Sequence, residues 1–445
     1  MTVERGKVEF QHVSISPRSI GKIVTTEYGN YYIDVARDFM TRTKKVFLFI
    51  DESGNIEPVI EGRPWRNRYI IHSESEGIPP ATNLWDFNVF VETPETTLEE
   101  AFKMAREVLA ETVVFPHERD LDYVTAWCMY SWLRGLFPKN VNVYFTGFPG
   151  TGKSQALKFI KLFGRYPADY DPLATKSFKW TIHHSLGILI LDEAEYLTRS
   201  SIARLRRYHE TDIYEQRTIG LPLVGLTSID LRVDAPIAMA ATHVPADIAF
   251  MQRGLLFRMV KRSPKVKDFS RIPHLDYIQK VFAKTVLINW KRITESAIQV
   301  TSDFEREHFD ERVKDLAFPI ATIFKALGRP IGYPLAIALI SFIQAYYATI
   351  EGTVFALVLK DVHSMAWEER GRYIIPIRKV MEAIGKITSE FGLKREKMLY
   401  LTQYFFAGAH VRWENNELCY VIDKETFDSF IMSLGIPTSS GDIIL

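Results

Sequence analysis

One segment of the chain combines glycines with a lysine and a serine at a fixed spacing: Gly147, Phe148, Pro149, Gly150, Thr151, Gly152, Lys153, Ser154 and Gln155. It fits the pattern G-x-x-x-x-G-K-[ST], in which backbone N–H groups surround phosphate oxygens because glycine has no Cβ to obstruct them. The lysine of this pattern reaches the β- and γ-phosphates, and the next hydroxyl binds Mg²⁺. We therefore expect residues 147–155 to bind ATP, with Lys153 also acting in catalysis and Ser154 acting as a metal ligand.

Two adjacent carboxylates, Asp192 and Glu193, follow the apolar run Ile188–Leu191. A buried strand that ends in carboxylates places them at the carboxyl edge of a parallel sheet, beside the phosphate loop. We expect Asp192 to hold Mg²⁺, directly or through water, and Glu193 to orient and polarise the attacking water. Hydrolysis requires such a pair, whereas a module that only binds phosphate does not.

Four further residues are candidates for the same site. Thr242 and His243 end the apolar run Pro236–Ala241, and either one would be directed at the γ-phosphate or the attacking water. The alternative is a polar strand end without a catalytic role. Arg253 and Arg258 follow, and an arginine at a subunit boundary stabilises charge on the γ-phosphate of a neighbouring nucleotide. Arg253 is the first candidate for that role, since Arg258 is alternatively a surface residue of the next strand.

The elements that must position these residues form an α/β pattern. Buried strands are predicted over residues 140–146, 186–191 and 235–241, with a helix over residues 155–163 after the glycine-rich turn. Strands that alternate with helices at this spacing predict a parallel sheet. Beyond Pro264 the pattern is helical through about residue 355.

The rest of the chain divides by pattern. Residues 1–92 are β-rich, with strands predicted over 45–51 and 66–72. Thr96 and Thr97 before Leu98 predict a helix start, and a second helix is expected over 121–136. The expected domains are a β-rich N-terminal domain (1–92), a helical connector (93–139), an ATPase core (140–263), a helical lid (264–355) and a winged-helix-like C-terminal domain (356–445).

The overall composition restricts the function classes. The chain has 55 Lys and Arg against 54 Asp and Glu, a formal net charge of +1, which excludes a uniformly basic nucleic-acid binder. Hydrophobic residues make up 47% of the chain, which excludes a largely disordered protein. Cys128 and Cys419 cannot form a disulfide framework, which favours a reduced, cytoplasmic setting. The longest apolar run, Pro334–Ile350, is shorter than the roughly 20 residues of a membrane-spanning helix, so no membrane partner is expected.

Three stretches resemble a known group of ATPases. They are the phosphate loop with its Asp192-Glu193 strand, the segments 234–240 and 247–253, and the segment 311–328, which contains Arg312, Asp315 and Pro319. Residues 147 to about 345 are similar to the ATPase region of phage- and plasmid-borne primase–helicases, an AAA+-like group related to superfamily 3 helicases. The third stretch resembles the helical-lid signature of that group.

The resemblance has consequences for fold, assembly and activity. It implies an AAA+-type α/β domain with a helical lid. It also implies a homo-oligomeric, hexameric ring with ATP between subunits and Arg253 acting in trans. It implies ATP-driven translocation on single-stranded or forked DNA. Superfamily 3 proteins usually have an asparagine where this chain has Thr242-His243, so the sensor assignment departs from the pattern. No primase-like carboxylate cluster precedes residue 140, so a fused primase activity is not expected.

Positive charge is concentrated in two places, Arg199–Arg207 and Arg253–Arg271. Such residues would hold backbone phosphates without reading sequence. The alternative is a solvated helix face or a contact between subunits. Between the two clusters, residues 214–220 and 228–233 are expected to form a hairpin with an apolar tip at Leu221–Val224, directed at the pore or packed against protein.

The C-terminal region offers a separate candidate for DNA binding. Helices are expected over 379–391 and 394–406, followed by a hairpin over 411–423 with Asn415-Asn416 at its turn and a last helix from Lys424. Two helices and a hairpin resemble a winged-helix domain. The expected DNA contacts are Lys394, Arg395, Lys397 and Arg412. Many winged helices bind protein instead, and Trp413 and Tyr420 would then simply pack across the hairpin.

The sequence therefore predicts a Mg²⁺-dependent ATPase, most simply a ring-forming replicative helicase of a virus, plasmid or other mobile element. Three alternatives use the same phosphate loop. They are an AAA+ remodelling or DNA-loading ATPase without unwinding activity, a P-loop kinase for a small substrate, and a nucleotide-gated binding module that hydrolyses little.

Overall fold

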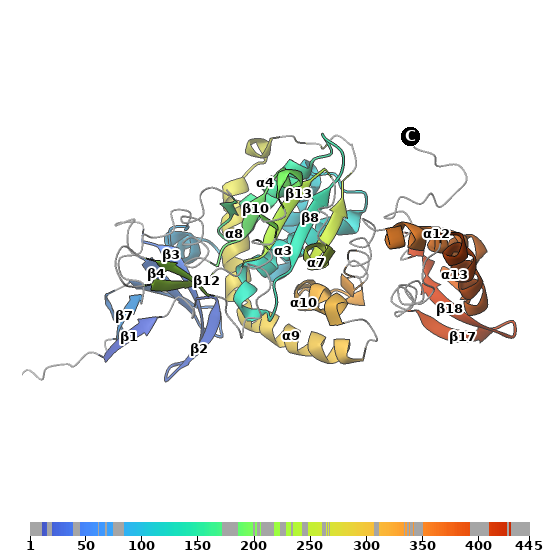
Figure 1. The fold of residues 1–445 in the computed structure, drawn as a ribbon. Helices are drawn as coiled ribbons and strands as arrows, with labels where there is room; N and C mark the ends of the chain where they lie inside the picture. The colour runs from blue at the N-terminus through green and yellow to red at the C-terminus, as the bar shows by residue number, and fades with distance from the viewer. Residues whose placement is uncertain are drawn as a thin grey trace, which may run out of the picture.

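The computed structural model describes residues 11–15, 20–38, 45–60, 62–66, 69–73, 84–170, 186–198, 201–202, 205, 218–222, 228–232, 235–242, 248–259, 264, 266, 268–306, 311–332, 334–335, 338, 341, 350–391, 409–424 and 427–428. A parallel sheet with surrounding helices forms the middle of the chain, preceded by antiparallel strands and followed by a smaller α/β part (Figure 1). The mixed α/β class and the β-rich N-terminal region predicted from the sequence are confirmed.

Five strands of the described chain form the central sheet, in the order β14 (Gly254–Arg258), β8 (Asn142–Thr146), β13 (Ile237–Ala241), β10 (Leu189–Leu191) and β9 (Ala168–Asp169). All neighbours are parallel. Every residue of β8, β13 and β10 is buried, as expected for strands covered on both faces. The three predicted strands begin slightly later than expected. An apolar pattern indicates burial, and residues such as Val141 and Ala235 are buried but precede the strands.

The order of the strands corrects one expectation about the site. Strand β10, which carries Asp192 and Glu193 at its end, does not lie beside the phosphate-loop strand β8, because β13 pairs with both. Neighbouring strands lie about 4.8 Å apart, so β10 is about 10 Å from β8. A buried apolar strand does not specify its neighbour by periodicity, and the sequence could not indicate this order.

Helices α2 (Leu98–Thr112), α3 (Glu118–Trp132), α4 (Lys153–Phe163) and α8 (Leu275–Ile288) pack against one another around the sheet. Helix α2 begins as predicted: the Thr97 hydroxyl accepts from the Glu100 N–H at 3.2 Å, and the Glu100 carboxylate accepts from the Thr97 N–H at 3.3 Å. Helix α3 ends at Trp132, before the predicted end at residue 136. Helix α8 was expected in the lid, but it packs directly against α4.

The N-terminal region forms two sheets. One is an antiparallel sheet of β2 (Lys22–Thr26), β3 (Gly29–Arg37), β4 (Lys45–Ile50) and β5 (Ile56–Ile60), in that order. The other contains β1 (Gln11–Ile15), β7 (Tyr69–Ser73) and β6 (Pro64–Trp65), with β1 parallel to β7. Strands β4 and β7 correspond to the two strands predicted here.

The N-terminal sheet is joined to the core by buried polar contacts. Asp34 of β3 forms an ion pair with Arg165, just after α4, and both side chains are fully buried. The next residue, Tyr166, donates its hydroxyl hydrogen to the Val35 carbonyl at 2.8 Å. The Trp290 indole N–H donates to the carbonyls of Ile50 and Asp51 at 3.1 and 2.9 Å. Strands β3 and β4 therefore share a core with the segments around α4 and α8.

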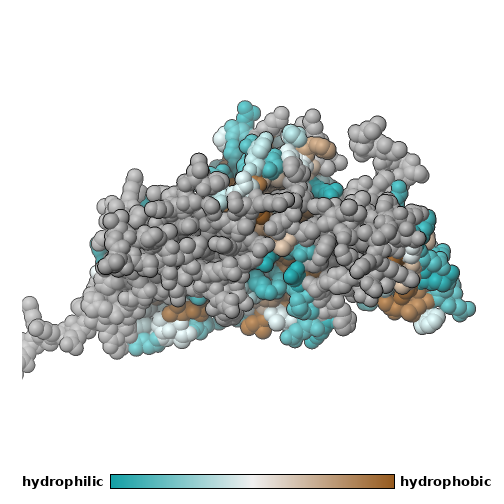
Figure 2. Space-filling model, in the orientation of Figure 1, coloured by the Kyte–Doolittle hydropathy of each residue, from teal (hydrophilic) through white to brown (hydrophobic). Residues whose placement is uncertain are grey.

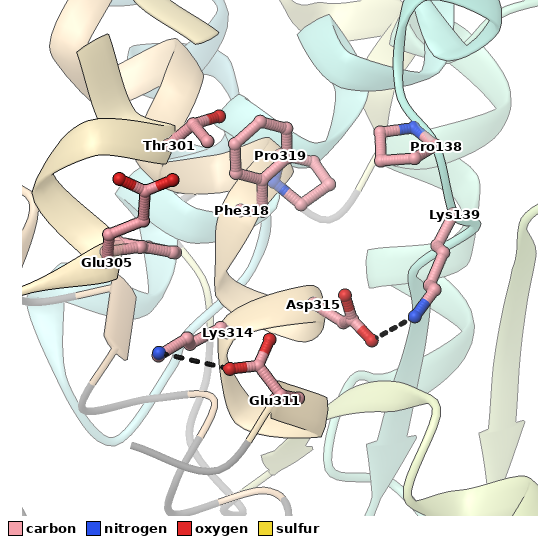
Figure 3. A pocket seen from close by; sticks show the side chains of 10 residues that line it. Pro138, Lys139, Thr301, Glu305, Glu311, Lys314, Asp315, Phe318 and Pro319 are labelled. Carbon is pink, nitrogen blue, oxygen red and sulfur yellow. Dashed lines mark hydrogen bonds and ion pairs between the residues drawn. The ribbon is translucent and has the colours of Figure 1, made fainter. Parts of the chain in front are cut away.

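Helices α9 (Trp290–Glu305) and α10 (Glu311–Ala326) form the next layer. The residues that carried the lid resemblance connect α10 to the central sheet: Asp315 forms an ion pair with Lys139, and Arg312 donates to the Gln252 side chain at 3.1 Å. Pro319 and Asp315 line a cavity of about 320 Å³ together with Pro138 and Lys139 (Figure 3). Lys139 precedes the amino end of β8, so this cavity lies away from the phosphate loop.

The C-terminal part contains α12 (Ile350–Met365), α13 (Ile377–Phe391) and an antiparallel sheet in the order β15 (Trp367–Glu369), β16 (Arg372–Pro376), β18 (Glu417–Asp423) and β17 (His410–Glu414). The predicted hairpin is confirmed, with Asn415 and Asn416 at φ values of 49° and 65°. Strands β15 and β16 were not predicted. Helix α12 continues across residue 355, so the domain boundary expected there falls inside a helix.

Two of the predicted C-terminal segments fall wholly or mostly outside the described residues. The helix expected over 394–406 lies outside the described residues, and the last helix is described at only a few positions from Lys424 onward. Among the helices that are described, none is long and apolar enough to cross a membrane. In the view of Figure 2, the hydrophobic areas on the described residues are small and separated by hydrophilic ones.

Candidate functional site

The phosphate-loop segment connects strand β8 to helix α4. Gly147, Gly150 and Gly152 have φ values of 147°, 79° and 91°, a region that residues with a Cβ rarely adopt. Gly152 is the N-cap, and the helix begins at Lys153, slightly earlier than predicted. Lys153, Ser154 and Gln155 therefore occupy the first turn, where the backbone N–H groups point out of the helix end and favour an anion. This backbone fits a phosphate group.

Gly147 is the most crowded of these glycines. A Cβ at this position would lie 2.6 Å from the Met259 carbonyl oxygen and 3.1 Å from the Thr151 hydroxyl oxygen. Met259 is held in place because its N–H donates to the Thr146 carbonyl at 2.6 Å. The end of β14 thus packs directly against the loop, which leaves no room for a side chain.

We expect Gly147→Ala to weaken ATP binding by about 10- to 100-fold, because a non-glycine residue at this φ costs about 1–3 kcal/mol in backbone strain alone. Titration with a fluorescent ATP analogue measures the effect. Gly332→Ala is the control, since a Cβ there meets nothing within 4 Å. Equal affinities for the two variants would contradict the expectation.

The Lys153 side chain folds back over the loop. Its ammonium group donates to the Gly147 and Phe148 carbonyls at 2.7 and 3.1 Å. To reach the β- and γ-phosphates, the ammonium would exchange these carbonyl oxygens for phosphate oxygens. Thr151 also donates to the Phe148 carbonyl, at 2.9 Å, whereas the Phe148 ring itself is 84% exposed.

Asp192 and Glu193 are exposed at the end of β10, at the same carboxyl edge of the sheet as the phosphate loop. Glu193 has a φ of 52°, an uncommon conformation for a residue other than glycine, and its N–H donates to an Asp192 carboxylate oxygen at 3.0 Å. Backbone strain of this kind clusters at functional sites. Both predicted carboxylates therefore lie at the expected carboxyl edge of the sheet, but about two strand spacings from the loop strand and not next to it.

Sequence reasoning missed Glu195. Its two carboxylate oxygens accept hydrogen bonds from the Thr242 N–H at 3.2 Å and from the Thr242 hydroxyl at 3.1 Å. Burial alone would raise the pKa of Glu195, but hydrogen bonds from its own N–H and from Thr242, together with the charge of Lys153, hold it below its ordinary value. The only signal in the sequence was a third carboxylate close behind Asp192 and Glu193. His243, the other sensor candidate, lies outside the described residues.

The two candidate arginines lie at opposite ends of strand β14. Arg258 pairs with Thr146 at the carboxyl end of β14, next to the phosphate loop, and is exposed. Arg253 precedes β14, and its carbonyl accepts from the Asn142 N–H at 3.0 Å, at the amino edge. The intervening strand spans about 16 Å. Arg253 is therefore remote from the phosphate loop of its own subunit, whereas Arg258 is adjacent to it.

The donor groups fit Mg²⁺ better than a metal held entirely by protein. Within the described ranges, no group of three or more His, Cys, Asp or Glu could hold a metal ion. Mg²⁺ is usually bound by one or two carboxylates together with substrate phosphates and water. Ser154, in the first turn of α4, and Asp192, at the end of β10, would provide oxygen ligands of this kind at the carboxyl edge of the sheet.

Only a few of the residues expected to contact DNA belong to the described part of the chain. Most of the basic residues of both clusters, and Lys394, Arg395 and Lys397, lie outside the described residues. Arg412 forms ion pairs with Glu369 at 3.2 Å and with Glu414 at 2.6 Å, so two carboxylates oppose its charge.

The hairpin between the basic clusters is present but differs at its tip. Strands β11 (Thr218–Pro222) and β12 (Ser228–Arg232) pair antiparallel. Leu221 and Pro222, expected at the tip, belong to β11 and pair with Ile229 and Ser228. The strand therefore continues through the first half of the segment expected at the tip, and the other half, Leu223 and Val224, lies outside the described residues.

No protein-family model matches the chain, and no curated protein matches it. Among solved structures, the full-length MCM homolog from Methanopyrus kandleri is similar, with a TM-score of 0.36 and 11% sequence identity over 71% of this chain and 76% of that chain. A likeness this distant does not transfer a function. The functional conclusion therefore depends on the geometry of the chain itself.

Proposed function

We propose that this protein is a Mg²⁺-dependent ATPase. One observation carries the proposal: the Gly147–Ser154 loop and the Asp192-Glu193 pair lie at the same edge of one parallel sheet, with Thr242 directly after the strand between them. A glycine turn without a role in phosphate binding would need neither a lysine folded over the loop nor carboxylates at the same edge of the sheet.

Each residue has a distinct role in this proposal. The backbone of residues 147–155 surrounds the phosphates, and Lys153 holds the β- and γ-phosphates by charge. Ser154 and Asp192 hold the metal, which when bound offsets the negative charge of the phosphate oxygens. Glu193 orients and polarises the attacking water.

We further propose an AAA+-type ring related to superfamily 3 helicases that couples hydrolysis to translocation on DNA. Arg253 lies far from the phosphate loop of its own subunit, so it would complete the site of a neighbour. Phe148 and Tyr196 are 84% and 79% exposed at the phosphate edge, where a neighbouring subunit in the proposed ring would cover them. These observations support assembly of subunits through the carboxyl edge of the sheet, where the nucleotide would bind.

Glu193→Gln is expected to lower the rate of ATP hydrolysis by at least about 100-fold, because the amide cannot accept a proton from water. ATP binding should be retained, in contrast to Lys153→Ala, which should bind weakly. Phosphate release is measured with and without single-stranded DNA, and binding is measured with an ATP analogue. Hydrolysis at the wild-type rate in Glu193→Gln would refute the assignment.

The same preparation separates the alternatives. DNA-stimulated hydrolysis without unwinding of forked DNA, with a tail of either polarity, would indicate a remodelling or DNA-loading ATPase. Phosphate transfer to a small acceptor would indicate a kinase. ATP binding without turnover would indicate a nucleotide-gated binding module. Unwinding that disappears in Glu193→Gln would support the helicase.

A further inference from the structure

We propose that Glu195 is a positioning residue that turns the Thr242 hydroxyl into a hydrogen-bond acceptor for the attacking water. Glu193 would accept one hydrogen of that water, and Thr242 would accept the other. The inference rests on the proposed ATP hydrolysis and adds a residue that was not recognised from the sequence.

The contact geometry defines the direction of the hydrogen bond. Both oxygens of the Glu195 carboxylate are used, one by the Thr242 N–H at 3.2 Å and one by the Thr242 hydroxyl at 3.1 Å. An ionised carboxylate can only accept, so the single hydroxyl hydrogen of Thr242 is donated to Glu195. Toward any other group, the Thr242 oxygen can then act only as an acceptor.

This polarity decides between the two roles considered for Thr242. An oxygen of the γ-phosphate is itself an acceptor, so it cannot pair with the Thr242 oxygen while the hydroxyl hydrogen is donated to Glu195. A water molecule can donate to that oxygen. Thr242 is therefore suited to hold the attacking water and not to sense the γ-phosphate directly.

The strand order places Thr242 between the phosphate loop and the carboxylate pair. Thr242 directly follows β13, which lies between the phosphate-loop strand β8 and the carboxylate strand β10. A water that donates one hydrogen toward Glu193 and one toward Thr242 keeps a lone pair for attack on phosphorus. The lowered pKa of Glu195 keeps the carboxylate ionised at neutral pH and so preserves the polarity of the hydroxyl.

Replacing Glu195 with glutamine tests this polarity with a minimal change in shape. The glutamine oxygen would still accept from the Thr242 N–H, but its amide nitrogen would donate to the Thr242 oxygen. The hydroxyl hydrogen would then point toward the site, and the amide would occupy one of the two lone pairs of the Thr242 oxygen, so the hydroxyl would no longer be held as an acceptor for water. A purely structural contact would lose stability without a selective loss of turnover.

We expect Glu195→Gln to lower kcat for ATP hydrolysis by about 10- to 100-fold, as misplacement of a reacting group does, with KM for ATP within about twofold. Thr242→Val should show the same loss, and Thr242→Ser should recover most of it because the hydroxyl is restored. The double variant Glu195→Gln/Thr242→Val should be no slower than either single variant, since both remove one function. Glu99→Gln, whose carboxylate pairs with Arg292 outside the site, is the control for loss of a charge.

Several outcomes would overturn the inference. An unchanged kcat in Glu195→Gln, a rise in KM alone, or multiplied losses in the double variant would each do so. A loss in Glu195→Gln with normal turnover in Thr242→Val would also overturn it, since Glu195 would then act by itself. Thermal melting of each variant excludes loss of folding. Glu193→Gln is measured in parallel, because normal turnover in that variant would reject the proposed function itself and not only this addition.

Discussion

Arg253→Ala is expected to lower ATP hydrolysis in the assembled protein by about 10³–10⁵-fold, the usual contribution of an arginine that stabilises charge on the γ-phosphate. ATP binding should change little, because Arg253 lies at the amino edge of the sheet, away from the loop that would bind the phosphates. Phosphate release and analogue binding, measured on the same oligomer, give the two quantities. Normal hydrolysis in assembled Arg253→Ala would show that another residue has this role.

Mixed assemblies test whether Arg253 acts in trans. In a ring of Arg253→Ala and Lys153→Ala subunits, some sites combine an intact phosphate loop with an intact Arg253 from the neighbour. We therefore expect activity to return on mixing two inactive proteins. If Arg253 acted within its own subunit, no site would be intact and mixing would restore nothing.

Arg258 provides the matched comparison. It lies beside the phosphate loop of its own subunit, next to Thr146. If Arg258 contributes to hydrolysis in its own subunit, mixing Arg258→Ala with Lys153→Ala should not restore activity, because every site in the mixture then lacks either Arg258 or Lys153. The two mixtures together separate an arginine that acts across subunits from one that acts within a subunit.

Arg165→Met is expected to lower the free energy of unfolding by about 3–5 kcal/mol at pH 8, since it leaves a buried carboxylate without its counter-charge. Asp34 and Arg165 are both fully inaccessible to solvent. Arg165 also donates to the Trp132 carbonyl at 3.2 Å, so the pair joins β3, α3 and the segment after α4. Urea unfolding, compared at equal protein concentration, measures the loss.

The effect of Arg165→Met should depend on pH in a defined direction. Burial raises the pKa of Asp34 from 3.8 to about 6, and the charge of Arg165 limits the rise, so removal of Arg165 should raise this pKa further. A carboxyl with a higher pKa in the native state stabilises folding when protonated, and that contribution is lost as pH rises through the native pKa. The variant should therefore be less destabilised at pH 5 than at pH 8.

The double variant Asp34→Val/Arg165→Met is the control. It removes both charges together, so most of the lost stability should return, and the pH dependence due to Asp34 should disappear. If the double variant is as unstable as Arg165→Met, loss of packing and not an unpaired charge would be the cause.

The sequence by itself determined the parts of the site that are local. Gly147–Ser154 specify a turn and a helix start because the positive φ values and the helix N-terminus depend on adjacent residues only. Asp192 and Glu193 could be placed at a strand end for the same reason. The capping box at Thr97 and the Asn415-Asn416 turn are likewise complete within a few residues.

Only the tertiary structure decided which distant segments meet. The insertion of β13 between β8 and β10, the contact of Glu195 with Thr242, and the pairing of Asp34 with Arg165 each join residues far apart in the chain. Strand neighbours and buried polar partners are selected by the packing of the whole core, which no short pattern encodes. For the same reason the position of Arg253 could not be predicted. The register of β14 on β8 places it at the amino end of the sheet.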